Sequence, residues 1–316
     1  MKIIHLSYPN NIKPEEKLGP ISLALGFFDG VHKGHQQVIG EAISHAKKHS
    51  IQSAVMTFDP HPSVVLGGRK EEVFYITPMQ KKLEILNSMG VDICFVVRFT
   101  SDFAKLTPEQ FIHIFIKELN VVHVTAGFDF SFGCKGEGNM KTMEEAGKEF
   151  FSVSTIQKQV DGEEKISSTR IRNLLKSGEV DEVCRLLGRP YRISGTVVNG
   201  DKRGRTIGFP TANVEPEIGT FVPGRGVYAV SIWVQERKYN GVCNVGFKPT
   251  FNNPDVKKQT VEVYILEFDK TIYGEMVDVD WYLRIRDEKK FSGIDELKVQ
   301  IQKDKETAID FFKSLT

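Results

Sequence analysis

The stretch Gly26-Phe27-Phe28-Asp29-Gly30-Val31-His32-Lys33-Gly34-His35 decides the fold of the first half of this 316-residue chain. It ends an apolar run, residues 21–28, which is typical of a buried strand. After it, apolar residues recur at helical spacing: Val38, Ile39, Ala42, Ile43 and Ala46. The quoted stretch is therefore predicted to be the turn between a buried strand and a helix.

The first half continues this alternation. Residues 52–58, 91–97 and 121–126 read as further buried strands. Thr77-Pro78 and Thr107-Pro108 each predict a helix start, with Thr as the N-cap and Pro as the first helical residue, and Gly90 is predicted to end the first of these helices. We expect an α/β, Rossmann-like domain with a mostly parallel sheet covered on both faces, whose ligands bind at the carboxyl ends of the strands.

The pattern changes near Arg189-Pro190. From there the predicted strands are short and punctuated by Gly and Pro: residues 193–198, 227–234, 239–245, 261–268 and 276–283. This spacing favours a mainly antiparallel β-barrel or sandwich. We place the domain boundary between Leu186 and Arg192, which gives domains 1–186 and 187–316.

A terminal helix is predicted to open near Ser292, with Asp295 three residues on. Its apolar positions are expected to pack on the barrel: Ile294, Leu297, Ile301, Ile309 and Phe312.

The charge balance argues against a nucleic-acid partner. Forty-two Lys and Arg nearly cancel 41 Asp and Glu, so the formal net charge is only +1. Residues 1–10 lack a signal-peptide pattern, and the apolar runs are too short to span a bilayer. We therefore expect a cytoplasmic protein with no membrane partner; the oligomeric state is left open.

Metal chemistry is restricted by residue type. The four cysteines are scattered without a C-x-x-C pair, so they are expected to be buried or half-buried thiols. All eight histidines precede residue 124. A metal in the second half should therefore be a hard cation that is held by oxygen atoms.

The turn after the first strand carries the chemistry of the first half. A helix N-terminus offers free N–H groups to phosphate, and Gly34 leaves room for the phosphates to approach. His32 and His35 can point the same way and donate to phosphate oxygens, on which charge accumulates during attack at an α-phosphorus. Two exposed loop histidines are the alternative, but the position between strand and helix favours an ATP-using nucleotidyltransferase.

A second element has three hydroxyls at a helix start, followed by an arginine one turn on: Ile166-Ser167-Ser168-Thr169-Arg170-Ile171-Arg172. This combination suits a triphosphate, although a plain N-cap with a solvated arginine is the alternative. The chain has no P-loop motif, and Gly133, Gly136 and Gly138 are in the wrong order for a dinucleotide fingerprint.

The second half holds a glycine-rich basic stretch, residues 200–213, which could form a flap over phosphate. In an extended segment Thr211 and Asn213 face the same side, where their oxygens could share a Mg²⁺ ion. Glu262 faces opposite to Val261 and Val263 and could accept a proton from a hydroxyl that attacks a γ-phosphate. An ordinary basic loop and a solvated strand glutamate are the alternatives.

Four segments of the first half, residues 26–35, 58–62, 127–130 and 166–172, resemble those of prokaryotic bifunctional FAD synthetases, which belong to the HIGH-type nucleotidyltransferases. The resemblance implies that AMP passes from ATP to FMN, giving FAD and pyrophosphate. It also implies site residues of three kinds. The catalytic residues are His32, His35 and Arg172; the ATP-binding residues are Gly26, Phe27, Asp29, Gly34, Asp129, Ser168 and Thr169; His61 and Pro62 border the flavin or nucleotide.

Residues 204–213, Gly226-Val227-Tyr228, residues 241–246 and Pro249-Thr250-Phe251 are similar to the riboflavin kinase domain of the same family. The resemblance implies that Thr211 and Asn213 bind Mg²⁺, that Gly204 and Arg205 bind ATP, and that Glu262 is the base toward the ribityl 5′-hydroxyl. Ser131 and Tyr264 depart from the residues expected at their positions.

The leading hypothesis is an enzyme that converts riboflavin to FMN in the C-terminal domain and FMN to FAD in the N-terminal domain, with ATP and Mg²⁺. An alternative keeps only FAD synthesis, the C-terminal domain being a flavin-binding module. A non-catalytic flavin- or RNA-binding regulator is disfavoured by the charge balance and the two intact motifs. A tRNA synthetase would need an anticodon-binding domain with a basic face.

Overall fold

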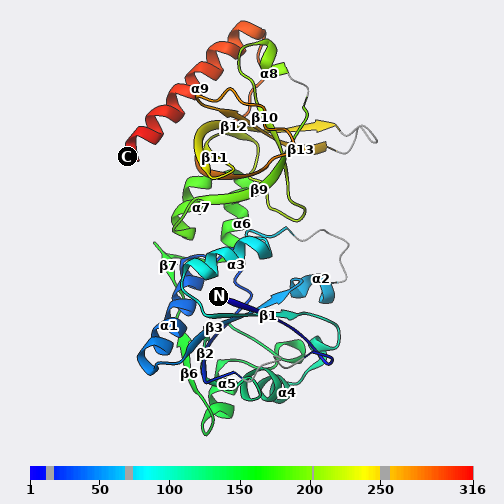
Figure 1. The fold of residues 1–316 in the computed structure, drawn as a ribbon, viewed down its shortest axis with the longest axis vertical. Coiled ribbons are helices and arrows are strands. Elements are labelled where there is room, and N and C mark those ends of the chain that lie inside the picture. The colour runs from blue at the N-terminus through cyan, green and yellow to red at the C-terminus, as the bar shows by residue number, and fades with distance from the viewer. Residues whose placement is uncertain (12–17, 68–73, 201–202, 250–256, 316) are drawn as a thin grey trace. The chain divides into compact units, whose positions relative to one another are not determined.

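The computed structural model describes residues 1–11, 18–67, 74–200, 203–249 and 257–315. The chain forms two compact units, Met1–Ser167 and Ser168–Thr316 (Figure 1). Asp201, Lys202, Thr250 and Phe251, which belong to the predicted flap and to a kinase-like segment, lie outside the described residues.

The first unit is built on a six-stranded sheet in which every strand pair is parallel. In spatial order its strands are β1 (Lys2–Ser7), β4 (Ile93–Arg98), β3 (Gln52–Asp59), β2 (Ile21–Leu25), β5 (Val121–Gly127) and β6 (Ser152–Ile156). After β2 the chain forms β3 and then β4 on one side of β2. It later forms β5, which pairs with the other side of β2. The strand order therefore reverses beside β2, which is where ligands bind in open α/β sheets.

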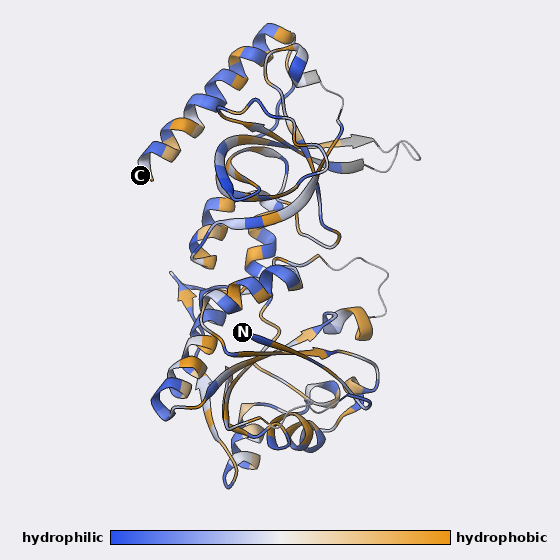
Figure 2. Ribbon diagram, in the orientation of Figure 1, coloured by the Kyte–Doolittle hydropathy of each residue, from blue (hydrophilic) through white to orange (hydrophobic). Residues whose placement is uncertain are grey.

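Helices cover both faces of this sheet, as the sequence predicts. They are α1 (Lys33–His49), α2 (Pro62–Leu66), α3 (Met79–Ser88), α4 (Pro108–Ile112), a π-helical turn (His113–Lys117), α5 (Met140–Gly147) and the 3₁₀ turns Phe103–Lys105 and Cys134–Gly136. Alternate strand residues enter two apolar layers: Ala24 packs with α1 and α3, and Leu23 and Leu25 pack with the π-helical turn. Strand β2, in the middle of the sheet, is hydrophobic along most of its length (Figure 2). A small hairpin, β7 (Val160–Asp161) and β8 (Glu164–Lys165), completes the unit.

The two predicted Thr-Pro helix starts have different outcomes. Thr107 caps α4 in a capping box with Gln110, as predicted. Helix α3 begins one residue late, at Met79, and its N-cap Pro78 makes no side-chain bond, so the predicted Thr77 cap is wrong. The backbone N–H of Thr77 instead donates to the Asp29 carboxylate, which fixes this residue outside the helix. Gly90, with φ of +84°, follows α3 as predicted.

The second unit contains α6 (Ser168–Ser177), α7 (Val180–Leu187) and a closed antiparallel barrel. The barrel strands follow the order β10 (Ala212–Pro216), β13 (Lys257–Ile265), β12 (Arg237–Pro249), β11 (Gly226–Val234), β14 (Met276–Arg286) and β9 (Tyr191–Val198). The short helix α8 spans Arg203–Thr206. Strand β10 is the one barrel strand that the sequence reading did not identify. The domain boundary that the sequence predicts between Leu186 and Arg192 stays a prediction. The second compact unit begins earlier, at Ser168, and therefore includes α6 and α7.

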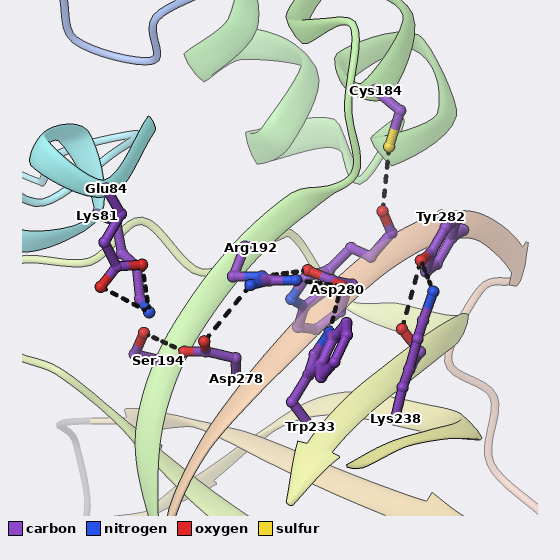
Figure 3. Close-up of polar contacts among 12 residues, drawn as sticks. Lys81, Glu84, Cys184, Arg192, Ser194, Trp233, Lys238, Asp278, Asp280 and Tyr282 are labelled. Atoms are coloured by element: carbon purple, nitrogen blue, oxygen red, sulfur yellow. Dashed lines mark hydrogen bonds and ion pairs between the residues drawn. The ribbon is translucent and has the colours of Figure 1, made fainter. Parts of the chain in front are cut away.

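An ion pair joins β9 to β14 on the outside of the barrel. Arg192 Nη2 donates to Asp280 Oδ2 over 2.7 Å, and the Trp233 indole N–H donates to the same oxygen over 2.8 Å (Figure 3). Asp280 is only 3% exposed, so these donors satisfy a buried carboxylate.

The terminal helix α9 (Ile294–Ser314) packs on the barrel near its C-terminal end, where Ala308, Phe311 and Phe312 meet Val227 and Val242. Its start differs from the prediction. The N-cap is Gly293, and Ile294 is 60% exposed, so the predicted packing of Ile294 on the barrel is wrong. Ser292 hydrogen-bonds Glu296, not Asp295.

A buried ion pair anchors the middle of α9. Arg286 on β14 donates to both Asp304 oxygens, over 2.9 Å from Nε and 2.7 Å from Nη2. Gln300 Nε2 donates to the same carboxylate.

All four cysteines are free thiols that are buried or half-buried, as predicted. Across the described ranges, no helix combines the length and apolar character that a membrane crossing requires.

Candidate active sites

The turn between β2 and α1 has an unusual backbone. Phe28, Gly30 and Val31 all have positive φ, at 54°, 88° and 41°. Left-handed conformations cost energy for non-glycine residues and persist where the surroundings enforce them, often at functional sites. Here Phe28 and Val31 are 2% and 0% exposed, so core packing holds the turn. Gly26 is required because a Cβ there would lie 2.7 Å from the Phe28 ring.

The turn places His32 and His35 side by side, as the sequence predicts. His32 is the N-cap of α1, and its Nδ1 accepts the backbone N–H of His35 over 3.2 Å. The two rings stack with centroids 3.6 Å apart and planes at 17°. Because Nδ1 of His32 accepts, its Nε2 carries the proton of the neutral ring and can donate to a ligand. Glycine suits position 34, because a Cβ there would crowd the His32 ring at 3.2 Å.

The His35 ring is kept neutral by its surroundings. Burial lowers the pKa of His35 well below 6.5, and nearby His32, Lys82 and Lys165 lower it further. Among the described residues, its buried Nδ1 has no hydrogen-bond partner. An anionic ligand at the α1 N-terminus would meet two imidazoles and free backbone N–H groups.

Asp29 lies under the turn and is 2% exposed. Its carboxylate accepts the backbone N–H groups of Ile76 and Thr77 over 3.2 and 3.0 Å. These bonds tie the turn to the segment that enters α3. The predicted contact of Asp29 with ATP stays a prediction.

An aromatic cluster stands at the same edge of the sheet. The Phe27 ring meets His61 edge-on with centroids 4.3 Å apart. It also faces Tyr75 with centroids 6.3 Å apart and planes inclined by 29°. The backbone N–H of His61 donates to the Tyr75 hydroxyl, and His61 caps α2 with Pro62 as its first residue. These half-buried rings offer a surface on which a planar flavin or adenine could stack. Sequence reasoning missed Tyr75, because no local motif links it to His61.

An ion pair lies beyond β5, on the other side of the strand-order reversal. Asp129 pairs with Lys165 of β8, whose Nζ also lies 4.8 Å from the centroid of the Phe128 ring. Both charged side chains are about half exposed, at 57% and 41%. Lys165 was also missed from the sequence, since its partner is 36 positions away.

Ser168, Thr169 and Arg172 belong to the first part of α6, in the second unit. Ile171 and Leu175 form the buried face of this helix, while Thr169 is exposed and Arg172 half-buried. Their roles in binding phosphate stay predictions.

In the barrel, a row of polar residues crosses three strands. Asn213 of β10 lies directly opposite Glu262 of β13, and Asn244 of β12 lies opposite Glu262 from the other side. Residues directly opposite in an antiparallel sheet share a face, so the three side chains lie together. Val261 and Val263 are buried on the other face, which confirms the predicted alternation. Sequence reasoning did not single out Asn244, although a quoted segment includes it.

The glycine-rich stretch folds against this row. A Cβ on Gly200 would lie 2.2 Å from the Asn213 amide. One on Gly204 would lie 2.2 Å from the Phe209 carbonyl oxygen, and the Thr211 hydroxyl lies 3.5 Å from the same point. Only glycine permits this approach of the backbone. Arg205 is exposed, while Phe209 packs edge-on against Tyr264, two residues after Glu262.

Comparison with known proteins assigns a family model to each part of the chain. The FAD synthetase model matches residues 15–170, and the riboflavin kinase model matches residues 187–312. The bifunctional riboflavin kinase/FMN adenylyltransferase of Bacillus subtilis is 47% identical over 315 residues, covering 100% of this chain and 99% of the relative. The protein of the same name from Escherichia coli K12 is 38% identical and covers 92% of each chain.

A crystal structure of a macrolide-efflux protein from Streptococcus pneumoniae has the same fold, with a TM-score of 0.88, 35% identity, and coverage of 98% of this chain and 99% of that one. The two family models match successive parts of the chain, and curated relatives match along its whole length. The chain therefore belongs to the family of bacterial bifunctional riboflavin kinase/FMN adenylyltransferases.

Proposed function

We propose that this chain phosphorylates riboflavin to FMN in its C-terminal part and adenylylates FMN to FAD in its N-terminal part, with ATP as the donor in both reactions. The observation that carries the proposal is the pair of separate polar clusters. The stacked His32 and His35 lie within the FAD synthetase match, and the Asn213–Glu262 pair lies within the riboflavin kinase match.

In the N-terminal reaction, a phosphate oxygen of FMN attacks the α-phosphorus of ATP, and pyrophosphate leaves. His32, His35 and the α1 N-terminus stabilise the negative charge that develops on the phosphate oxygens. The backbone of Gly26, Phe27 and Gly34 and the side chain of Asp129 line the nucleotide. Ser168, Thr169 and Arg172 bind the triphosphate, and His61 and Pro62 border the flavin.

In the C-terminal reaction, the ribityl 5′-hydroxyl of riboflavin attacks the γ-phosphorus of ATP, and ADP leaves. Glu262 accepts the hydroxyl proton. Gly204 and Arg205 cover the phosphates.

Mg²⁺ is the metal that this donor set suits. The hydroxyl of Thr211 and the amide oxygen of Asn213 are hard ligands, and no larger cluster of His, Cys, Asp or Glu in the described part of the chain could hold a metal ion. Thr211 and Asn213 would hold the cation, which would neutralise phosphate charge when bound. Because both reactions use ATP, we expect the protein to act in the cytoplasm.

The alternative of FAD synthesis alone is less well supported. It leaves the Asn213–Glu262 pair and the riboflavin kinase match without a role. The test is to incubate the purified protein with riboflavin, ATP and Mg²⁺ and to separate the flavins by chromatography. We expect FMN first and FAD after it. Untouched riboflavin, with added FMN still converted to FAD, would support the alternative.

A further inference from the structure

Lys82 of α3 is a buried cation that the reactions above do not use. Its side chain is 1% exposed, and Nζ donates to the Phe27 carbonyl over 2.8 Å and to the Thr57 hydroxyl over 3.2 Å. Nζ also lies 4.4 Å from the centroid of the Phe27 ring. Among the described residues it forms no ion pair. A buried ammonium with only neutral acceptors is costly for stability.

The location of this charge is specific. Phe27 follows β2 and Thr57 belongs to β3, so Nζ lies between the carboxyl ends of two adjacent strands, beneath the turn that leads to the histidine pair. Two groups that act on it electrostatically are Asp29 in the turn and Asp59 at the end of β3. Its own charge reaches the histidine pair, since it helps to lower the pKa of His35.

Hydrogen bonding alone does not account for a lysine at this position. The Thr57 hydroxyl already donates to the Phe27 carbonyl over 2.8 Å. A neutral glutamine could supply a second donor, and a methionine would fill the space without the desolvation cost. What a lysine adds is positive charge, and the nearby site is the one at which phosphate is expected to bind.

We propose that Lys82 is a positioning residue for adenylyl transfer, which holds the ATP triphosphate and the leaving pyrophosphate through its buried positive charge without touching them. The inference rests on the proposed function of the N-terminal site. It predicts that the buried charge of Lys82 lowers the stability of the folded protein and is retained for function, as is common where charged groups are buried at active sites.

The charge should be present at neutral pH and lost in mild alkali. Burial lowers the pKa of Lys82 from 10.5 to about 8, while the carboxylates of Asp29 and Asp59 and the Cys94 thiol oppose this shift. A bound triphosphate favours the protonated form. The kcat/KM for ATP in FAD formation should therefore fall above pH 8 more steeply than kcat does. His35 titrates far below this range.

The test compares Lys82→Gln, which keeps a donor without charge, and Lys82→Met with Lys81→Met. Lys81 is the neighbouring residue and pairs with Glu84 across one turn of α3. Lys81→Met therefore also removes one positive charge from α3, at the position next to Lys82. Each full-length variant is assayed for FAD formation, for the reverse reaction of FAD with pyrophosphate to give FMN and ATP, and for FMN formation.

We expect both Lys82 variants to lose about 10- to 100-fold in kcat/KM for ATP and for pyrophosphate. Their alkaline loss should disappear, their melting temperature should equal or exceed that of the unsubstituted protein, and FMN formation and the Lys81 control should be unchanged. Full activity of Lys82→Gln, or a lowered melting temperature with loss of both activities, would overturn the inference. If the unsubstituted protein makes no FAD, the proposed function has failed instead.

Discussion

Asn213 and Glu262 lie directly opposite each other on the neighbouring antiparallel strands β10 and β13. The amide that is proposed to bind the metal therefore shares a face with the carboxylate that is proposed to accept the proton. A phosphate donor held at Asn213 would be presented to a hydroxyl held at Glu262. This arrangement of metal ligand and base beside one another is what phosphoryl transfer requires.

Replacement of Glu262 tests the base. Glu262→Gln keeps the shape of the side chain but cannot accept the proton, so we expect a loss of about 10²- to 10⁴-fold in the rate of FMN formation. FAD formation from added FMN should be retained. Equal loss of both reactions in a folded protein would contradict the assignment of two separate sites.

Replacement of His35 should have the opposite effect. His35→Ala removes one of the two stacked imidazoles, and we expect FAD formation to fall by at least about 10²-fold, while FMN formation persists. His49→Ala is a matched control on the same helix, since His49 is exposed at the far end of α1. Chromatographic assay of both flavins with each variant gives the measurement. Unaltered FAD synthesis by His35→Ala would remove the histidine pair from the mechanism.

The metal requirement of the kinase reaction should depend on Asn213. We expect chelation of Mg²⁺ to stop FMN formation, and Asn213→Ala to raise the Mg²⁺ concentration for half-maximal rate by about tenfold or more. The measurement is the initial rate of FMN formation against Mg²⁺ concentration. An unchanged Mg²⁺ dependence would show that Asn213 is not a ligand.

The N-terminal unit should lose stability in acid through His123. Its ring is buried and stacked on His45 with centroids 3.7 Å apart, and burial, with His45 and His49 nearby, lowers the pKa of His123 from 6.5 to about 4. Folding thus favours the neutral ring. Its contribution is complete above pH 6.5 and is lost as the pH falls toward 4, amounting to about 3 kcal/mol.

Denaturant unfolding between pH 7.5 and pH 4 measures this dependence. His123→Phe keeps a ring against His45 and cannot be protonated, so we expect its free energy of unfolding to fall less steeply over that range. Parallel curves for the two proteins would exclude His123 as the titrating group.

The sequence by itself determined the local structure and the chemistry of the motifs. The turn from strand to helix with its paired histidines, the Thr107 capping box and the alternation around Glu262 are all set by residues within a few positions of one another. Hydrophobic period, caps and glycine punctuation act over that range, so they can be read from the chain.

Tertiary structure decided which distant residues meet. The pairing of Asn213 with Glu262, Tyr75 with His61, and Lys82 with the Phe27 carbonyl depends on strand register and on how α3 docks against the sheet. The same holds for the hydrogen bond from the Thr77 backbone N–H to the Asp29 carboxylate, which keeps Thr77 from capping α3 as predicted. These contacts join residues separated by 14 to 55 positions. Their geometry is fixed by the packing of whole elements, which no local pattern in the sequence encodes.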